Sequence, residues 1–134
     1  MFRCSRVLLN AVRGTKVSTG ITGLAVHPDP LPVLTQTYKS TLSTLSQIPA
    51  ESVYRQATEA ILKQRVAIIE KANGDVEAVE RELDAGQIEE VLLVAKDEQT
   101  LAGKMIEWKT WEPLQVKPAP GQWDPIGEDM GQAH

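Results

Sequence analysis

Histidine and cysteine are the side chains best suited to acid–base or nucleophilic chemistry near neutral pH, and this 134-residue chain has few of them. His27 lies between a valine and a proline, His134 is the last residue, and Cys4 is the single cysteine. A catalytic histidine needs a nucleophile or carboxylate held within hydrogen-bond reach. The sequence shows no such arrangement around His27. We therefore expect a surface or capping role for it and predict that the chain is not itself an enzyme.

The chain also offers little that could hold a metal or a cofactor. One cysteine and two histidines are too few for the usual zinc or iron–sulfur ligand sets. Gly20 and Gly23 are not spaced as a phosphate-binding loop, and no dinucleotide-binding fingerprint follows a strand. We expect no metal and no cofactor.

Carboxylates are plentiful, and most of them fall on the outer faces of the expected helices. These are Glu77, Glu80, Glu82, Glu89, Glu90 and Asp97. A solvated charged surface explains them better than an acid–base pair, which needs two carboxyl groups in different environments. Glu98 differs because helical spacing places it near apolar residues, between Val91 and Met105. We expect its carboxylate to meet a basic side chain across a helix seam or on a partner.

Four large apolar side chains are further candidates for contact with a partner protein. Trp108, Trp111 and Trp123 gather near the end of a chain that has few aromatic residues. Trp108 lies on an apolar stripe, which favours packing over the end of the bundle. For Trp111 and Trp123, which flank a proline-rich extension, end packing and partner contact remain open. Leu93 falls among polar positions and should face outward. With Glu98, these four residues form the predicted partner interface.

Apolar residues at three- and four-residue spacing predict that helices position these side chains. The expected fold is all-α, a small three-helix bundle with one additional short helix, formed by residues 31–112. The predicted helices run from an Asp29 cap to Pro49, from a Ser52 cap to Ala72, from Val76 (capped by Asp75) to about Asp84, and from Gln87 to Lys109. On the second, the pattern groups Tyr54, Ala57, Ile61, Ile68 and Ile69 on one face.

The last helix has an unusually wide apolar arc. Beside its main apolar stripe lies a second one, formed by Val94, Leu101, Met105 and Trp108. An arc this wide indicates packing against two neighbours. Gly103, in the helix interior, costs about 1 kcal/mol relative to alanine, and close approach of another backbone would be a reason for it.

Both ends of the chain are expected to lie outside the bundle. Residues 1–18 contain three arginines and a lysine but no acid, the composition of a mitochondrial presequence or of an uncleaved basic leader. Residues 19–30 should form an extended lead-in, and 113–134 an extended proline- and tryptophan-containing tail with a disordered end. The four basic residues of the leader carry a charge of +4. Because the net charge of the whole chain is −4, the remainder carries −8. Such an acidic body is not expected to bind nucleic acid.

Five blocks of sequence, in the same order, resemble a known protein family. They are TGITGLAV at 19–26, YR at 54–55 with TE at 58–59, GQIEEV at 86–91, LA at 101–102 with KM at 104–105 and EWK at 107–109, and WEPL at 111–114. The chain resembles the NADH dehydrogenase 1 alpha subcomplex subunit 5 family, accessory subunits of mitochondrial respiratory complex I. The likeness covers about residues 18–124. The longer and more basic leader, Gly103 and the tail after residue 125 depart from the expected pattern.

The resemblance implies a non-catalytic structural or assembly subunit without redox centres. It would lie on the matrix side of the mitochondrial inner membrane, in the peripheral arm of complex I. Its partners would be core subunits of the hydrophilic arm and neighbouring accessory subunits. Because no apolar run approaches the roughly 18 residues of a membrane span, any membrane association would be through the complex. The alternative from the residues alone is a free-standing helical adaptor of the mitochondrial matrix.

Overall fold

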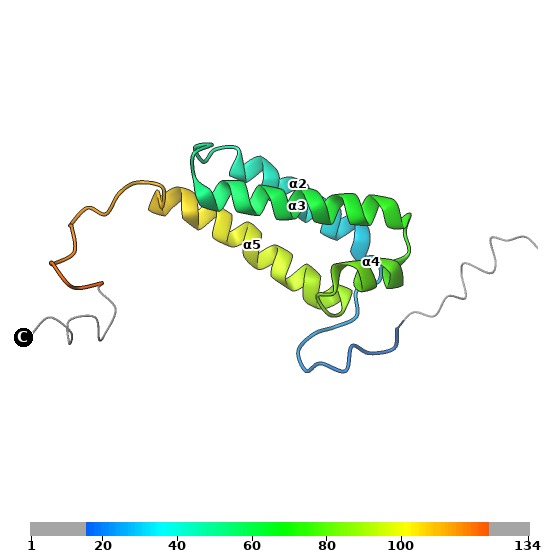
Figure 1. Cartoon of the computed structure of the whole chain (residues 1–134). Helices are drawn as coiled ribbons and strands as arrows, with labels where there is room; N and C mark the ends of the chain where they lie inside the picture. Colours follow the sequence, from blue (N-terminus) through cyan, green and yellow to red (C-terminus); the bar gives the residue numbers. More distant parts are fainter. Residues whose placement is uncertain (1–15, 124–134) are drawn as a thin grey trace, which may run out of the picture.

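The computed structural model describes residues 16–123 as a helical body with an extended segment at each end (Figure 1). Its helices are α2 Pro30–Leu45, α3 Val53–Ala72, α4 Val76–Leu83 and α5 Ile88–Trp108. No strand occurs between residues 16 and 123. The predicted all-α fold, three long helices and a short one, is confirmed. The first 15 residues of the predicted leader and the predicted disordered end lie outside the described residues.

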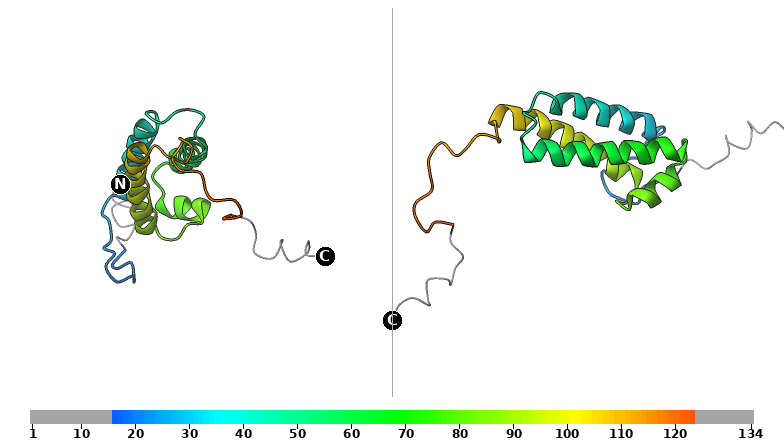
Figure 2. Two further views of the ribbon diagram at one scale, coloured as in Figure 1. Left: turned by 90° about the vertical axis from the view of Figure 1, so that its left-hand side faces the viewer. Right: turned by 45° about the horizontal axis from the view of Figure 1, so that its top comes forward.

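Helix α2 holds the bundle together because it packs against both other long helices. It contacts α5 along most of its length and also contacts α3, whereas α3 and α5 make little direct contact. Short α4 packs against the C-terminal part of α3 and the start of α5, between the two (Figures 1 and 2). None of the helices in residues 16–123 is long and apolar enough to cross a membrane.

Local signals in the sequence explain where the helices begin and end. Asp75 accepts hydrogen bonds from two backbone N–H groups in the first turn of α4, which confirms it as the cap. Asn73 ends α3 with a φ of 49°, in the left-handed region that asparagine tolerates. Asp29 and Ser52 occupy the N-cap positions of α2 and α3, but neither side chain makes a capping hydrogen bond.

The core lies between α2 and α5 and extends to one stripe of α3 and to α4. It consists of Leu31, Leu34, Tyr38, Leu45, Ile48, Leu62, Ile69, Val79, Ile88, Val91, Leu92, Ala95 and Ala102. The main apolar stripe predicted for α5 therefore packs into the core, as expected. Ala95 and Ala102 are almost completely buried, and their small side chains suit the close approach of α2.

The predicted buried face of α3 is wrong in part. The helix buries Thr58, Leu62 and Ile69, while Ala57 and Ile61 are exposed. Helix α3 packs chiefly against α2 and, near its end, against α4, so only a narrow stripe is covered. The hydrophobic pattern predicted that Ile61 is buried because it takes only hydrophobicity into account. A threonine can be buried on a helix instead, where its hydroxyl can form a hydrogen bond within the chain.

Gly103 is not explained by close approach of a backbone. It is exposed, and a Cβ atom added there would meet nothing within 4 Å. That expectation is wrong within the isolated chain, and the glycine remains a local weakness of α5.

Gly103→Ala should therefore raise the free energy of unfolding by about 1 kcal/mol, because alanine restricts the unfolded chain and favours the helix. Urea denaturation followed by circular dichroism would measure the change. Gly86→Ala is the matched control and should destabilise the protein: its φ is +86°, and the new Cβ would lie 2.6 Å from Oε2 of Glu90. A loss of stability on changing Gly103 would contradict the structure.

Candidate partner-binding surface

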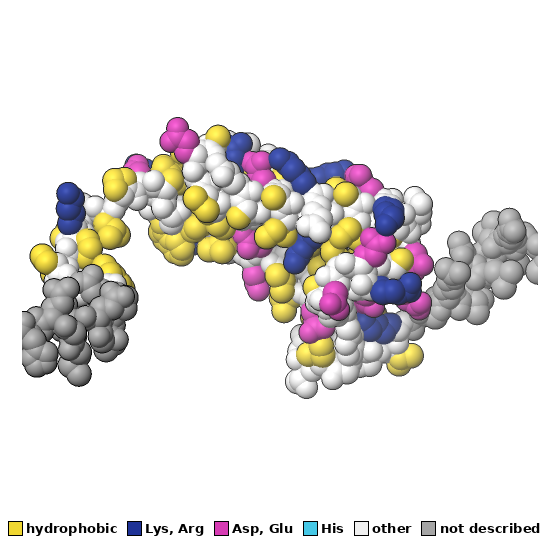
Figure 3. Space-filling model, in the orientation of Figure 1, with side chains coloured by type: hydrophobic (Ala, Val, Ile, Leu, Met, Phe, Trp, Pro, Cys, Tyr) yellow, Lys and Arg dark blue, Asp and Glu magenta, His cyan; other side chains and the backbone are white. Residues whose placement is uncertain are grey.

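Several large apolar side chains on α3 and α5 are left uncovered by the bundle. They are Val53, Ile61, Leu93, Val94, Leu101 and Trp108. Figure 3 shows apolar side chains gathered along α5 and along the edge of α3 that faces it. Exposed apolar side chains gathered in this way are typical of a surface that binds another protein.

The second apolar stripe of α5 accounts for much of this surface. Val94, Glu98, Leu101, Met105 and Trp108 follow one another at alternating steps of four and three residues, so they share one side of the helix. Val94, Leu101 and Trp108 are exposed, while Glu98 and Met105 are half-buried. The predicted second neighbour of α5 would be α3, but α3 lies too far away to cover the stripe.

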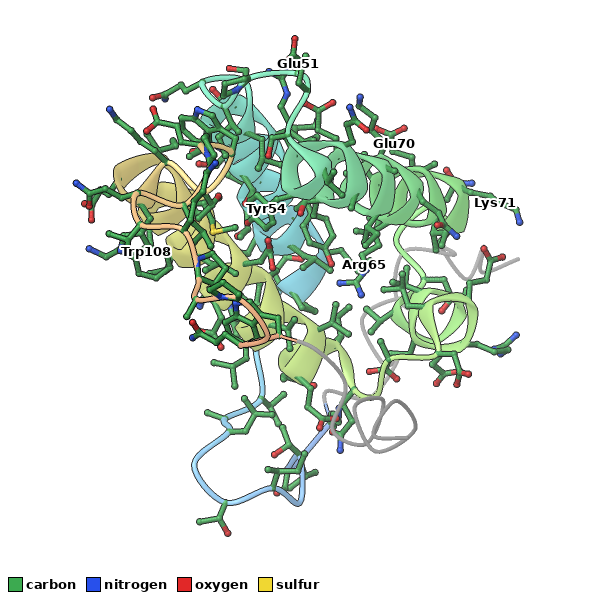
Figure 4. The ribbon with its side chains drawn as sticks, turned by 60° about the vertical axis from the view of Figure 1, so that its left-hand side comes forward. Glu51, Tyr54, Arg65, Glu70, Lys71 and Trp108 are labelled. Atoms are coloured by element: carbon green, nitrogen blue, oxygen red, sulfur yellow. The ribbon has the colours of Figure 1, made fainter. Side chains whose placement is uncertain are left out.

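A small hole opens between α3 and α5 beside this stripe, with a volume of about 160 Å³. Its lining residues are Tyr38, Thr58, Ile61, Leu62, Arg65, Val94, Ala95 and Glu98. In Figure 4, Tyr54 and Arg65 of α3 both point into the space between the helices. Two exposed apolar residues of the lining, Ile61 and Val94, come one from each helix.

Glu98 is tied to α3 by a tyrosine rather than by a basic residue. The Tyr54 hydroxyl donates a hydrogen bond of 2.6 Å to Oε1 of Glu98. Burial, together with the bond to Glu98 and its negative charge, raises the pKa of the Tyr54 hydroxyl, which therefore stays a donor. The predicted basic partner is wrong within the described chain. Helical spacing located the seam but could not identify the residue across it.

The three tryptophans have different surroundings. Trp108, expected to cover the end of the bundle, is instead 60% exposed. Trp111 takes that place, half-buried against the core, because Lys109 ends α5 in the left-handed region with φ 50° and turns the chain. Trp123 is exposed in the extended tail and does not anchor it. Leu93 is 52% exposed, facing outward as the pattern predicted.

The sequence did not reveal a second polar cluster, which fastens the lead-in to the start of α5. Glu89 is 4% exposed, and its Oε2 accepts a hydrogen bond of 2.8 Å from Nζ of Lys16. Its Oε1 accepts the backbone N–H of His27 at 3.4 Å, and the amide of Gln87 donates to the carbonyl of Thr19 at 2.8 Å. The expectation that Glu89 lies on a solvated face is therefore wrong.

Glu89 remains charged in this position because its partners outweigh its burial. Burial alone would raise its pKa, but hydrogen bonds from Lys16 and from backbone N–H groups, one of them that of His27, hold the pKa below the ordinary value of a glutamate. A buried carboxylate with these partners holds the lead-in against the start of α5 and is not placed to act as an acid or base in catalysis.

His27 has a local structural role. Its Nδ1 accepts the backbone N–H of Asp29 at 3.1 Å, just before α2 begins, in keeping with the expected surface or capping role. Across residues 16–123 there is no group of three or more histidine, cysteine, aspartate or glutamate residues that could hold a metal ion.

The fold and its surface define a class: a small helical protein whose exposed apolar surface is suited to packing against other proteins. A family model described as "ETC complex I subunit conserved region" matches residues 23–90. The chain belongs to this family.

Relatives from distant organisms agree. The chain is 44% identical to NADH dehydrogenase [ubiquinone] 1 alpha subcomplex subunit 5 of Bos taurus over 108 residues, which cover 81% of this chain and 92% of the relative. It is 42% identical to NADH dehydrogenase [ubiquinone] 1 alpha subcomplex subunit MCI4 of Candida albicans over 129 residues, 96% of this chain and 91% of the relative. The resemblance inferred from the five sequence blocks is confirmed. Family membership supports a non-catalytic accessory subunit and gives no support to a free-standing adaptor.

The fastening of the lead-in can be tested through its pH dependence. Because the pKa of Glu89 is lower in the folded state, its stabilising contribution is present above the ordinary pKa of a glutamate, near 4.3, and is lost as the pH falls through the lowered value. Glu89→Gln should reduce the free energy of unfolding at pH 7 by about 1–3 kcal/mol. The difference from the wild type should shrink in acid.

Glu82→Gln is the matched control, since Glu82 pairs with Lys71 at 3.0 Å on the exposed surface and such pairs contribute little. Urea denaturation at pH 7 and in acid would measure both variants. An equal loss for Glu89→Gln at both pH values would show that its charge is not what holds the lead-in.

Proposed function

We propose that the protein is a structural subunit in the matrix-side peripheral arm of mitochondrial complex I. It contacts core subunits of the hydrophilic arm and neighbouring accessory subunits, and it is held at the inner membrane through them. The observation that carries the proposal is the similarity to the Bos taurus subunit, which extends over 81% of this chain.

The described surface supports a role in an assembly. Large apolar side chains of α3 and α5 remain uncovered although charged residues make up 24% of the chain, an ordinary share that could have covered this surface. Protein interfaces are depleted of charge at their centres and enriched in aromatic residues, methionine and arginine. The basic leader, residues 1–18, is proposed as an import signal, in keeping with its composition.

The candidate contacts from the sequence stay part of the proposal, with different weights. Leu93, Trp108 and Trp123 are exposed and can be buried by a partner. Glu98 is half-buried and keeps a solvent-facing side, whereas Trp111, packed on the core, offers only its uncovered edge. All five lie on α5 or on the chain that follows it.

Native gel electrophoresis of mitochondria, followed by detection of this subunit, tests the proposal as a whole. The protein should migrate with the intact respiratory assembly and co-purify with it. Migration only as a small free protein would refute the proposed function.

Leu93→Asp should leave the helical content nearly unchanged but weaken incorporation into the complex. A charge at this exposed position costs little in water and much in a desolvated interface. Ala67→Asp, at an exposed position on α3 away from Leu93, is the control and should incorporate normally. Extensive unfolding of Leu93→Asp by circular dichroism would show instead that the leucine belongs to the core.

A further inference from the structure

We propose that the hole between α3 and α5 receives one large apolar side chain from an α-helix of a neighbouring subunit, and that this helix also places a basic residue beside Glu98. The inference rests on the proposed function and adds to it a specific site and the chemistry of its occupant.

The size of the hole sets the first requirement. About 160 Å³ is close to the volume of a cavity that holds a single benzene-sized group. Ile61 and Val94, both about half exposed, supply apolar contact from the two helices. One leucine-, methionine- or phenylalanine-sized side chain would fill this space, with Ile61 and Val94 excluding water around it.

Both ends of the hole are bounded by contacts that involve α3 and α5, so an occupant would contact both helices. At one end the hydrogen bond between Tyr54 and Glu98 joins α3 to α5. Toward the other end, α4 already packs between the same two helices and buries Val79 completely. The space between α3 and α5 thus accepts a helix at one end of the bundle (Figure 1), and the hole lies farther along the same two helices.

Charge sets the second requirement. Glu98 lines the hole, and it forms no ion pair within the part of the chain that the structure describes. Arg65 lines the same hole, but its Nη1 bonds to the Tyr38 hydroxyl at 3.4 Å. A half-buried carboxylate without a cation favours a lysine or arginine on the partner.

The other possible occupants fit less well. A second copy of this chain, related by a twofold axis through the hole, would bring Glu98 of one molecule toward Glu98 of the other, which is repulsive. The segment after Lys109 is rich in proline and leaves the body as an extended chain, with Leu114 and Val116 exposed, so it cannot supply a helix.

Photocross-linking in mitochondria tests the site. A benzophenone amino acid replaces Ile61 or Val94 in the full-length protein, with Glu70 and Thr100 on other exposed faces of the same helices as controls. Both test positions should cross-link, in the intact complex, to one segment of one subunit. That segment should be helical and carry a large apolar residue with a lysine or arginine one turn away.

The outcomes separate this inference from the proposed function. Cross-links to residues after Lys109, to a second copy, to unrelated subunits from the two positions, or none at all in a correctly assembled complex would each overturn the site while leaving the subunit role intact. Absence of the unmodified protein from the complex would refute the proposed function itself.

Glu98→Lys should lower the incorporated fraction about tenfold, because it brings two cations together in a desolvated seam. Glu98→Gln is the matched control: its amide oxygen can still accept the hydrogen bond from Tyr54, so incorporation should fall much less. Circular dichroism checks that both variants keep their helices. Reversing the charge of the cross-linked basic residue should restore Glu98→Lys, and normal incorporation of Glu98→Lys alone would overturn the charge requirement.

Discussion

The close packing of α2 against α5 is the contact on which the rest of the structure depends. Leu34 and Tyr38 of α2 are completely buried, and Ala95 and Ala102 of α5 are small enough to let the helices approach. Helix α3 joins this pair mainly through α2, and α4 fills only one end of the space between α3 and α5. Because α5 uses its main apolar stripe for α2, its second stripe is left without a neighbour. The exposed surface is thus a consequence of how the core forms.

The helices could be predicted from the sequence because their limits depend on local chemistry. Pro30, Asp75 and the asparagine and glycine at 73–74 act within one turn of where they stand, and α5 was predicted to within a residue at each end. The exposure of Leu93 was also predictable, since its position among polar residues fixes its direction on the helix. Family resemblance then supplied the function, which no pattern of reactive side chains could have given.

Side-chain partners were harder to predict because they depend on segments distant in sequence. Glu89 lies 73 residues from Lys16, and only the folded chain brings the lead-in over the start of α5. Tyr54 and Glu98 are 44 residues apart, so helical spacing could show that Glu98 lies on a seam but not which group meets it. The position of Trp111 likewise depends on the left-handed conformation of Lys109, a conformation that glycine adopts more readily and that the sequence at this helix end did not signal.

A surface that is unfavourable for a lone molecule becomes useful in an assembly. Each exposed apolar side chain on α3 and α5 gives up the stabilisation that burial would provide, of the order of 1.5–3 kcal/mol when complete. The net negative charge opposes association between copies of the chain, so the same surface stays available for a different protein. The Tyr54–Glu98 bond keeps α3 and α5 in register across the open seam without filling it. A partner would therefore meet a preformed site and lose little conformational entropy on binding.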